Sequence, residues 1–371
     1  MKVLVTGAKG FVGRNLCLTL QQMPDVEVLK YDLGDEPKLD GFVAECDFVF
    51  HLAGVNRPND PAEFKAGNTV FTEDILEKLA ARPNPPPVLL SSSIQAALDN
   101  DYGKSKAAAE EAVRAYGEKT GAPVFIYRLA NVFGKWCRPN YNSAVATWVY
   151  NIARDLPIMV RDPAATVTLV YIDDVVKSFV GHLSNPTCST CSTWLSVEPS
   201  YTKTLGEITD LIKSFHDEPT NLMVPNQQDG FTKKLYSTYL AALPEDKFSY
   251  PLTMHCDNRG SFTEALHSAE RGQVSVNVSK PGIAKGQHWH HTKHEKFLVV
   301  SGRGEINFRM ADDPKGKIIS YKVSGEKLEV VRIPPGYTHN IVNVGDTDMV
   351  TLMWANEVFA PANPDTFRLE V

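Results

Sequence analysis

A tyrosine and a lysine four residues apart, Tyr102 and Lys106, form the clearest chemical pattern in the sequence. On a helix this spacing places both side chains on one face. A phenol has an ordinary pKa of about 10, and a neighbouring ammonium stabilises its phenolate and lowers that pKa. Such a pair can protonate a ketone oxygen as hydride arrives. A surface pair is the alternative reading, but Tyr102 alone among thirteen tyrosines has a lysine four residues later.

The other requirements of ketone reduction are a hydroxyl that holds the oxygen and a carrier of hydride. Ser93 ends an apolar run that precedes Tyr102, and we select it as the hydroxyl. A glycine-rich turn near the start of the chain follows an apolar run and opens a helical stretch. In that position it admits the pyrophosphate of a dinucleotide to a helix N-terminus. The predicted cofactor residues in this turn are Gly7, Gly10, Phe11, Val12 and Gly13.

The choice between the two nicotinamide cofactors is read at the end of the second apolar run. An acid there holds the ribose 2′-hydroxyl of NAD, and a basic residue accommodates the 2′-phosphate of NADP. Asp32 lies nineteen residues after Gly13 and favours NAD, whereas Lys30 and Lys38 suit a phosphate. These residues leave NADPH and NADH as alternatives.

Five of the ten histidines lie in two short segments near the C-terminus. His288 and His290 are two apart, so on a strand they share a face, and Glu295 and His339 can reach the same point from neighbouring strands. Three imidazoles and one carboxylate suit zinc, iron, nickel or manganese. We predict one divalent metal per chain, with zinc as the first choice.

The residues of the two predicted sites lie in two regions with different patterns of secondary structure. Up to about residue 135, five apolar runs alternate with helical stretches at 10–22, 63–82 and 103–120, which is typical of βαβ units around a parallel sheet. Residues 136–215 are expected to cap that sheet, and residues 218–251 to form a connector with one helix. After residue 251, short strands separated by turn residues predict an antiparallel sandwich or barrel.

Composition and length limit the class of protein. A chain of 371 residues predicts two or three domains at about 150 residues each. A net charge of −6 without clustered lysine and arginine argues against nucleic-acid binding. The sequence has no apolar stretch of about 18 residues, so we expect no membrane span and a cytoplasmic protein with reduced thiols. Cys188 and Cys191 form a lone CxxC to which we assign no role.

The first 215 residues resemble an extended short-chain dehydrogenase/reductase of the nucleotide-sugar type. The motifs TGAKGFVG, HLAG, SSS, YGKSK, RLANVFG and YIDDV occur in that family's order. The resemblance implies that Ser93, Tyr102 and Lys106 are catalytic and that Asn131 lies near the substrate. It adds Leu52, Ala53 and Gly54, with Lys106, to the cofactor-binding residues. The interval of nine residues from Ser93 to Tyr102 is shorter than in many relatives, which implies a more open sugar pocket.

Residues 251–371 resemble a cupin. The first cupin motif fits the run from Gly282 through His288, His290 and Glu295 to Gly302, and the second fits PPGYTHNIVN around His339, apart from its leading glycine. The resemblance implies a small double-stranded barrel with His288, His290, Glu295 and His339 as metal ligands. Some cupins bind sugars without metal, so a metal-free pocket is the alternative.

Over nearly its whole length the chain resembles a bifunctional family of capsular-polysaccharide and O-antigen enzymes. That resemblance implies a Rossmann-like reductase domain (1–245) with a doubly wound parallel sheet, followed by an all-β cupin barrel (246–371). It implies C3 epimerisation of a UDP-2-acetamido-2,6-dideoxy-4-ketohexose and then NADPH-dependent reduction to the L-talose derivative, on the route to N-acetyl-L-fucosamine. We also expect a homodimer. One alternative is a single-activity reductase whose cupin binds sugar or assembles a dimer, and another is a non-enzymatic nucleotide sensor.

Overall fold

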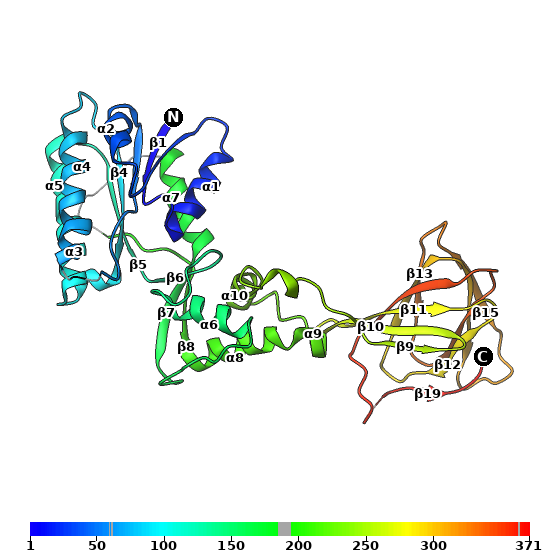
Figure 1. The fold of residues 1–371 in the computed structure, drawn as a ribbon. Helices are drawn as coiled ribbons and strands as arrows, with labels where there is room; N and C mark the ends of the chain where they lie inside the picture. Colours follow the sequence, from blue (N-terminus) through cyan, green and yellow to red (C-terminus); the bar gives the residue numbers. More distant parts are fainter. Residues whose placement is uncertain (59, 61, 185–193, 363) are drawn as a thin grey trace. The chain divides into compact units, whose positions relative to one another are not determined.

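The computed structural model describes residues 1–58, 60, 62–184, 194–362 and 364–371. They form two compact units, one of Met1–Ile212 with Lys234–Leu243 and the other of Lys213–Lys233 with Pro244–Val371 (Figure 1). The segments interleave near the expected boundary, so the division into domains 1–245 and 246–371 stays a prediction. Cys188 and Cys191 lie outside the described residues.

A five-stranded parallel sheet organises the first unit, in the order β2-β1-β3-β4-β5. Its strands coincide with the five apolar runs and are β1 (Lys2–Thr6), β2 (Glu27–Tyr31), β3 (Phe48–His51), β4 (Val88–Ser93) and β5 (Val124–Leu129). These runs are largely apolar because helices cover both faces of the sheet, although the edge strand β2 exposes Glu27 and Lys30. The carboxyl ends of the strands therefore bring Thr6, His51 and Ser93 to one edge.

Helices cover both faces of this sheet, which confirms the doubly wound prediction (Figure 1). One face carries α2 (Glu36–Glu45), α4 (Phe71–Ala80) and α5 (Asp101–Thr120), and the other carries α1 (Phe11–Gln21) and α7 (Ile172–Ser184). Leu4, Ile75 and Val113 belong to the core beneath the first face. The helix expected over 63–82 is interrupted, because the short α3 (Ala62–Phe64) and a π-helix (Lys65–Val70) precede α4.

A second, smaller sheet follows in the first unit. It contains β6 (Asn131–Phe133), β7 (Thr166–Tyr171) and β8 (Ser200–Thr204), accompanied by α6 (Ala144–Ile152) and α8 (Leu205–His216). The connector prediction was wrong in its number of helices. That stretch holds α9 (Glu218–Asn221), α10 (Gly230–Leu240) and a 3-10 turn (Glu245–Lys247). Lys234 of α10 pairs with Asp174 at 2.6 Å, and the part of α10 from Lys234 onwards belongs to the first unit.

From Met254 onwards the second unit is all-β and contains two antiparallel sheets, ordered β16-β13-β18-β11-β10-β9 and β15-β14-β17-β12-β19. The strands are β9 (Met254–Asp257), β10 (Gly260–Ser268), β11 (Gly272–Ser279), β12 (Ala284–Trp289), β13 (Glu295–Ser301), β14 (Arg303–Met310), β15 (Ile319–Ser324), β16 (Val330–Ile333), β17 (Tyr337–Asn343), β18 (Met349–Ala355) and β19 (Phe367–Arg368). Phe297 and Val331 of one sheet share a core with Ile306 and Ile341 of the other. The all-β prediction is confirmed, and the closed cupin barrel stays a prediction.

None of the described helices combines the length and the apolar character that crossing a bilayer requires.

Candidate active site and candidate metal centre

The predicted glycine turn is packed backbone against backbone. Gly7 has φ +69°, and a Cβ on it would lie 2.8 Å from the backbone nitrogen of Ala53. A Cβ on Gly13 would lie 2.1 Å from the Gly7 carbonyl oxygen, so neither position accepts a side chain. Gly10 is the N-cap of α1 and offers no side-chain hydrogen bond, while Phe11 and Val12 start the helix. The first N–H groups of α1 therefore remain available to a phosphate.

The predicted cofactor loop after β3 lies next to Lys106. The backbone N–H groups of Leu52 and Ala53 donate to the Thr6 hydroxyl at 3.1 and 3.2 Å, which ties this loop to the end of β1. A Cβ on Gly54 would lie 3.0 Å from Lys106 Nζ. Gly54 thus lets the loop approach the lysine closely, so the cofactor loop and the predicted catalytic lysine share one site.

The three residues predicted to be catalytic gather where β4 ends and α5 begins. Tyr102 and Lys106 both lie on α5, with Lys106 Nζ 6.0 Å from the Tyr102 ring centroid. Lys106 also donates to the Ser91 carbonyl at 3.3 Å. Ser93 accepts from the Gln95 backbone N–H at 3.2 Å, and its side chain acts to lower the pKa of Tyr102. The geometry supports the predicted grouping.

Burial controls the protonation of this pair. Burial raises the pKa of Tyr102, and the effect of the nearby Ser93 offsets only part of that rise. The net shift of this pKa is therefore upwards, opposite to the lowering that the sequence predicted. Burial also lowers the pKa of Lys106 to about 8, against a smaller opposing effect of Glu110. A lysine that titrates near pH 8 is an electrostatic stabiliser whose strength depends on pH.

A buried polar network behind Lys106 was missed by the sequence reasoning. The Glu110 carboxylate accepts hydrogen bonds from Ser92 at 2.5 Å, Arg128 at 2.7 Å and Trp194 at 2.8 Å. The Arg128 guanidinium also lies 3.7 Å from the Trp194 ring centroid. Because Ser92 precedes Ser93, this network anchors the end of β4. A glutamate one helical turn after Lys106 was the signal that could have revealed it.

The expected site of cofactor discrimination is a cavity of about 360 Å³. Its lining residues are Ala8, Lys9, Arg14, Lys30, Asp32 and Asp35. The Asp32 carboxylate accepts the backbone N–H groups of Lys9 at 2.6 Å and Leu33 at 2.9 Å. Lys38 does not line the cavity and pairs instead with Asp35 at 2.9 Å. The reasoning from sequence missed Arg14, which follows the last glycine of the turn.

Asn131, the predicted substrate residue, is exposed on β6, outside the main sheet. Its amide donates to the Thr168 carbonyl at 3.3 Å. Its role towards the substrate stays a prediction.

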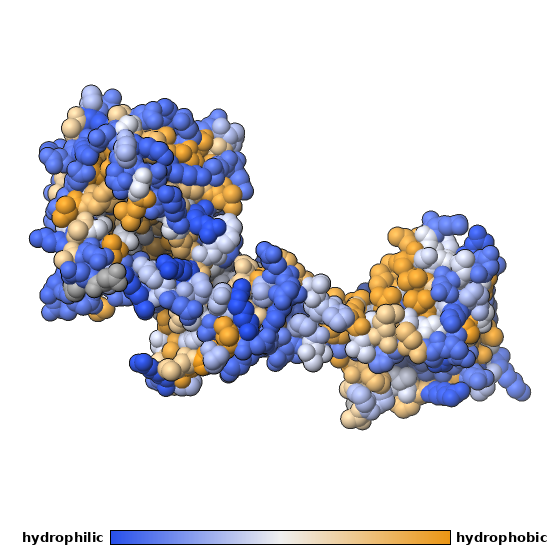
Figure 2. Space-filling model, in the orientation of Figure 1, coloured by the Kyte–Doolittle hydropathy of each residue, from blue (hydrophilic) through white to orange (hydrophobic). Residues whose placement is uncertain are grey.

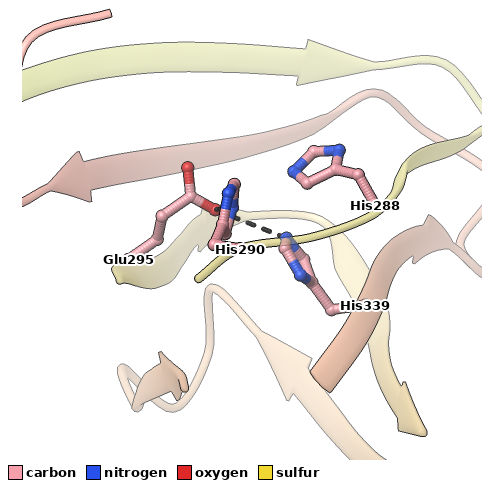
Figure 3. A group of neighbouring side chains, drawn as sticks. All are labelled: His288, His290, Glu295 and His339. Carbon is pink, nitrogen blue, oxygen red and sulfur yellow. Dashed lines mark ion pairs between the residues drawn. The ribbon is translucent and has the colours of Figure 1, made fainter. Parts of the chain in front are cut away.

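The four predicted metal ligands converge in the second unit (Figure 3). His288, His290, Glu295 and His339 each offer a ligand atom, and these atoms lie within 4.8 Å of one another. Glu295 Oε2 is 3.6 Å from His290 Nε2 and 3.3 Å from His339 Nε2.

The elements that carry these ligands differ from the expected ones. β12 and β17 do pair, with His288 opposite His339, but Glu295 comes from β13 in the other sheet rather than from a neighbouring strand. β12 ends at Trp289, so His290 lies just beyond the strand. A bulge between Gly286 and His288, with φ +64° at Gln287, lies immediately before the two histidines.

The donor atoms of this cluster fit a divalent metal. Three of them, His290 Nε2, Glu295 Oε2 and His339 Nε2, are buried without a hydrogen-bond partner within the described residues, which is costly unless another group satisfies them. Burial, followed by the proximity of His339, lowers the pKa of His288 to about 4. Burial works to raise the pKa of Glu295, but the two adjacent imidazoles outweigh it and hold this pKa well below its usual range. Neutral imidazoles and ionised carboxylates are the forms that bind metal, and the lowered pKa values of His288 and Glu295 favour these forms at those two positions.

Comparisons with known proteins match the N-terminal and C-terminal parts of the chain to two different families. Residues 3–189 match the NAD dependent epimerase/dehydratase family, and residues 255–367 match the polysaccharide biosynthesis C-terminal domain. The chain is 48% identical to the UDP-2-acetamido-2,6-beta-L-arabino-hexul-4-ose reductase of Pseudomonas aeruginosa, over 100% of this chain and 99% of that protein.

Solved structures show the same relationship. The capsular polysaccharide assembling protein CapF from Staphylococcus aureus is 49% identical, with a TM-score of 0.92 and coverage of 100% of both chains. RMD from Pseudomonas aeruginosa complexed with NADPH is 25% identical, with a TM-score of 0.51, over 58% of this chain and 82% of that one. The chain therefore belongs to the NAD dependent epimerase/dehydratase family, within the group exemplified by CapF that also carries a polysaccharide biosynthesis C-terminal domain.

Proposed function

We propose that this protein reduces the C4 ketone of a UDP-2-acetamido-2,6-dideoxy-4-ketohexose to give UDP-2-acetamido-2,6-dideoxy-L-talose. The observation that carries the proposal is the grouping of Ser93, Tyr102 and Lys106 beside the glycine turn. The Pseudomonas reductase, similar over its full length, supports the substrate class. The product belongs on the route to N-acetyl-L-fucosamine for capsule or O-antigen, in a cytoplasmic enzyme.

The reduction step assigns one task to each residue. Bound along the glycine turn, NADPH supplies the hydride that forms the new C–H bond at C4. Tyr102 gives its hydroxyl proton to the ketone oxygen, and solvent later restores that proton. Ser93 holds the oxygen by a hydrogen bond, and the charge of Lys106 stabilises the tyrosinate that remains.

We propose NADPH rather than NADH as the preferred carrier. Arg14 and Lys30 line the cavity beside Asp32, and within the described part of the chain neither forms an ion pair. Two cations without anionic partners favour a 2′-phosphate. The Asp32 carboxylate already accepts two backbone N–H groups, which reduces its capacity to hold a ribose hydroxyl.

We also propose that the second unit epimerises C3 before reduction. A divalent metal, zinc first, would be held by His288, His290, Glu295 and His339, and it would supply Lewis-acid stabilisation of negative charge on the C4 oxygen. The ketone acidifies the C3 proton, and this acidity is lost once C4 is reduced, which sets the order of the reactions. The alternative is a reductase whose second unit binds sugar or assembles a dimer.

We also propose that two copies of the chain form a homodimer through an apolar face of the second unit. Val330, Leu298, Leu352 and Val276 occupy paired positions on four neighbouring strands and share the face opposite the core. Val330 and Leu352 are 54% and 37% exposed, and apolar surface on this unit is visible in Figure 2. A continuous apolar face of this kind marks a protein interface, and a second copy offers the matching face.

Two measurements on the full-length protein test the reactions. Loss of NADPH absorbance with the UDP-4-keto sugar tests reduction, and incorporation of solvent deuterium at C3 without nicotinamide tests epimerisation. Absence of NADPH oxidation with both C3 epimers would exclude the reductase assignment. NADPH oxidation without deuterium exchange would support the single-activity alternative.

A further inference from the structure

The C-terminal segment folds back against the elements that carry the four-residue cluster. Asp365 accepts, through its backbone carbonyl, a hydrogen bond from His290 Nδ1 at 2.6 Å. β19 pairs with β12, with Arg368 opposite His288. The Leu369 carbonyl accepts the hydroxyl of Thr338, the neighbour of His339. One segment of eight residues therefore contacts three of the four ligand-bearing positions or their immediate neighbours.

We propose that residues 364–371 position the cluster and that Asp365 orients His290. This inference rests on the proposed metal site in one respect: the orientation of His290 serves the binding of the proposed metal. Asp365 is a positioning residue, since it acts through His290. The motifs that predicted the ligands contain no sign of it, because it lies 75 residues further along the chain.

The contact to the Asp365 carbonyl selects one tautomer of His290. A carbonyl oxygen only accepts hydrogen bonds, so Nδ1 must carry the proton. In the neutral ring, Nε2 then presents its lone pair towards Glu295 Oε2, 3.6 Å away. Fixing the tautomer of a histidine ligand through its second nitrogen is a general means of holding it ready for a metal.

The side chain of Asp365 holds its own carbonyl in place. Its carboxylate accepts the backbone N–H groups of His291, Thr292 and Lys293 at 2.9, 2.8 and 2.8 Å. Three successive N–H groups around one carboxylate form a compact anion-binding turn. Asp365 itself has φ +39°, which is unfavourable for most residues, so these contacts stabilise a strained conformation.

The other end of the segment supports the bulge in β12. Gln287, with φ +64°, accepts the Leu369 N–H through its backbone oxygen at 3.0 Å and the Val371 N–H through its side chain at 2.9 Å. This bulge immediately precedes His288. The C-terminal segment therefore supports the backbone just before His288, through Gln287, and also contacts His290, through Asp365.

Asp365→Ala in the full-length protein tests the inference. In the metal-free wild type, at a pH high enough to keep the His290 ring neutral, long-range ¹H–¹⁵N NMR should show the Nδ1–H tautomer, and the variant should show a tautomer mixture. Zinc affinity, measured by chelator competition, should fall about 10- to 100-fold, the range observed when outer-shell partners are removed. Asp365→Asn retains one acceptor oxygen and tolerates positive φ, so its effect should be intermediate.

The controls separate this inference from the proposed metal site. Asp257→Ala removes a carboxylate that also accepts a backbone N–H, in the other sheet, and should change neither readout. An unchanged circular dichroism spectrum and thermal unfolding profile verify that the second unit of each variant is folded. An unaltered His290 tautomer and zinc affinity in Asp365→Ala would overturn the inference. If the wild type binds no divalent metal, the metal site fails, while the tautomer comparison still decides the role of Asp365.

Discussion

The two candidate sites are assembled by different means. In the reductase unit, Tyr102 and Lys106 belong to one helix, and the glycine turn joins consecutive elements β1 and α1. In the second unit, the ligands come from two sheets and a turn, and Asp365 orients one of them from 75 residues away. The first site should therefore tolerate distant changes, and the second should be sensitive to them.

The largest effect is expected at the locally built site. Tyr102→Phe removes the proton donor and leaves the glycine turn intact, so turnover should fall about 10²- to 10⁴-fold. NADPH binding, measured by fluorescence titration, should remain close to that of the wild type. Lys106→Met should impair both, because Lys106 adjoins the cofactor loop at Gly54. Near-normal turnover of Tyr102→Phe would show that another group is the acid.

At the second site, His339→Ala or removal of metal by a chelator should suppress C3 exchange about 100-fold. The reason is that Lewis-acid stabilisation of the developing charge contributes several kcal/mol. Deuterium incorporation measured in the Tyr102→Phe background isolates this step. The same change should spare reduction of a 4-ketone that already has the correct C3 configuration. Exchange that survives both treatments would make the metal structural.

A smaller effect is expected for cofactor choice. Arg14→Gln removes one of two unpaired cations in the cavity, and a charge-assisted contact is worth enough to lower the NADPH preference about 10-fold. The KM for NADPH should rise while the KM for NADH changes little. Steady-state kinetics with both cofactors provides the comparison. A wild-type preference for NADH would show that Asp32 dominates, and Asp32→Arg should then favour NADPH.

The smallest effect is a dependence on pH in the reductase site. Burial lowers the pKa of Lys106 to about 8, so the stabilising positive charge is present below pH 8 and is lost as the pH rises through it. The rate of reduction should fall about twofold at pH 8 relative to its neutral plateau. Glu110 raises this pKa, so Glu110→Gln should move the inflection to lower pH. A flat profile from pH 7 to 9 would contradict the assignment.

Local patterns determined the reductase architecture in advance. The five apolar runs became the five parallel strands, and the glycine turn, Ser93 and the Tyr102–Lys106 pair lie together as expected. Such features are predictable because strand alternation and helix spacing are short-range, and parallel strands bring their carboxyl ends to one edge. The spacing of the histidines and the resemblance to the cupin motifs likewise identified His288, His290, Glu295 and His339 as one group.

Only the tertiary structure decided how those groups are held. Burial reversed the expected pKa direction at Tyr102, because desolvation depends on neighbours from the whole domain. The facing sheet, rather than a neighbouring strand, supplied Glu295, and the C-terminal segment supplied the partner of His290 Nδ1. The sequence by itself determined which residues are available for chemistry. Their protonation and orientation depend on contacts between residues far apart in the chain, which no local spacing encodes.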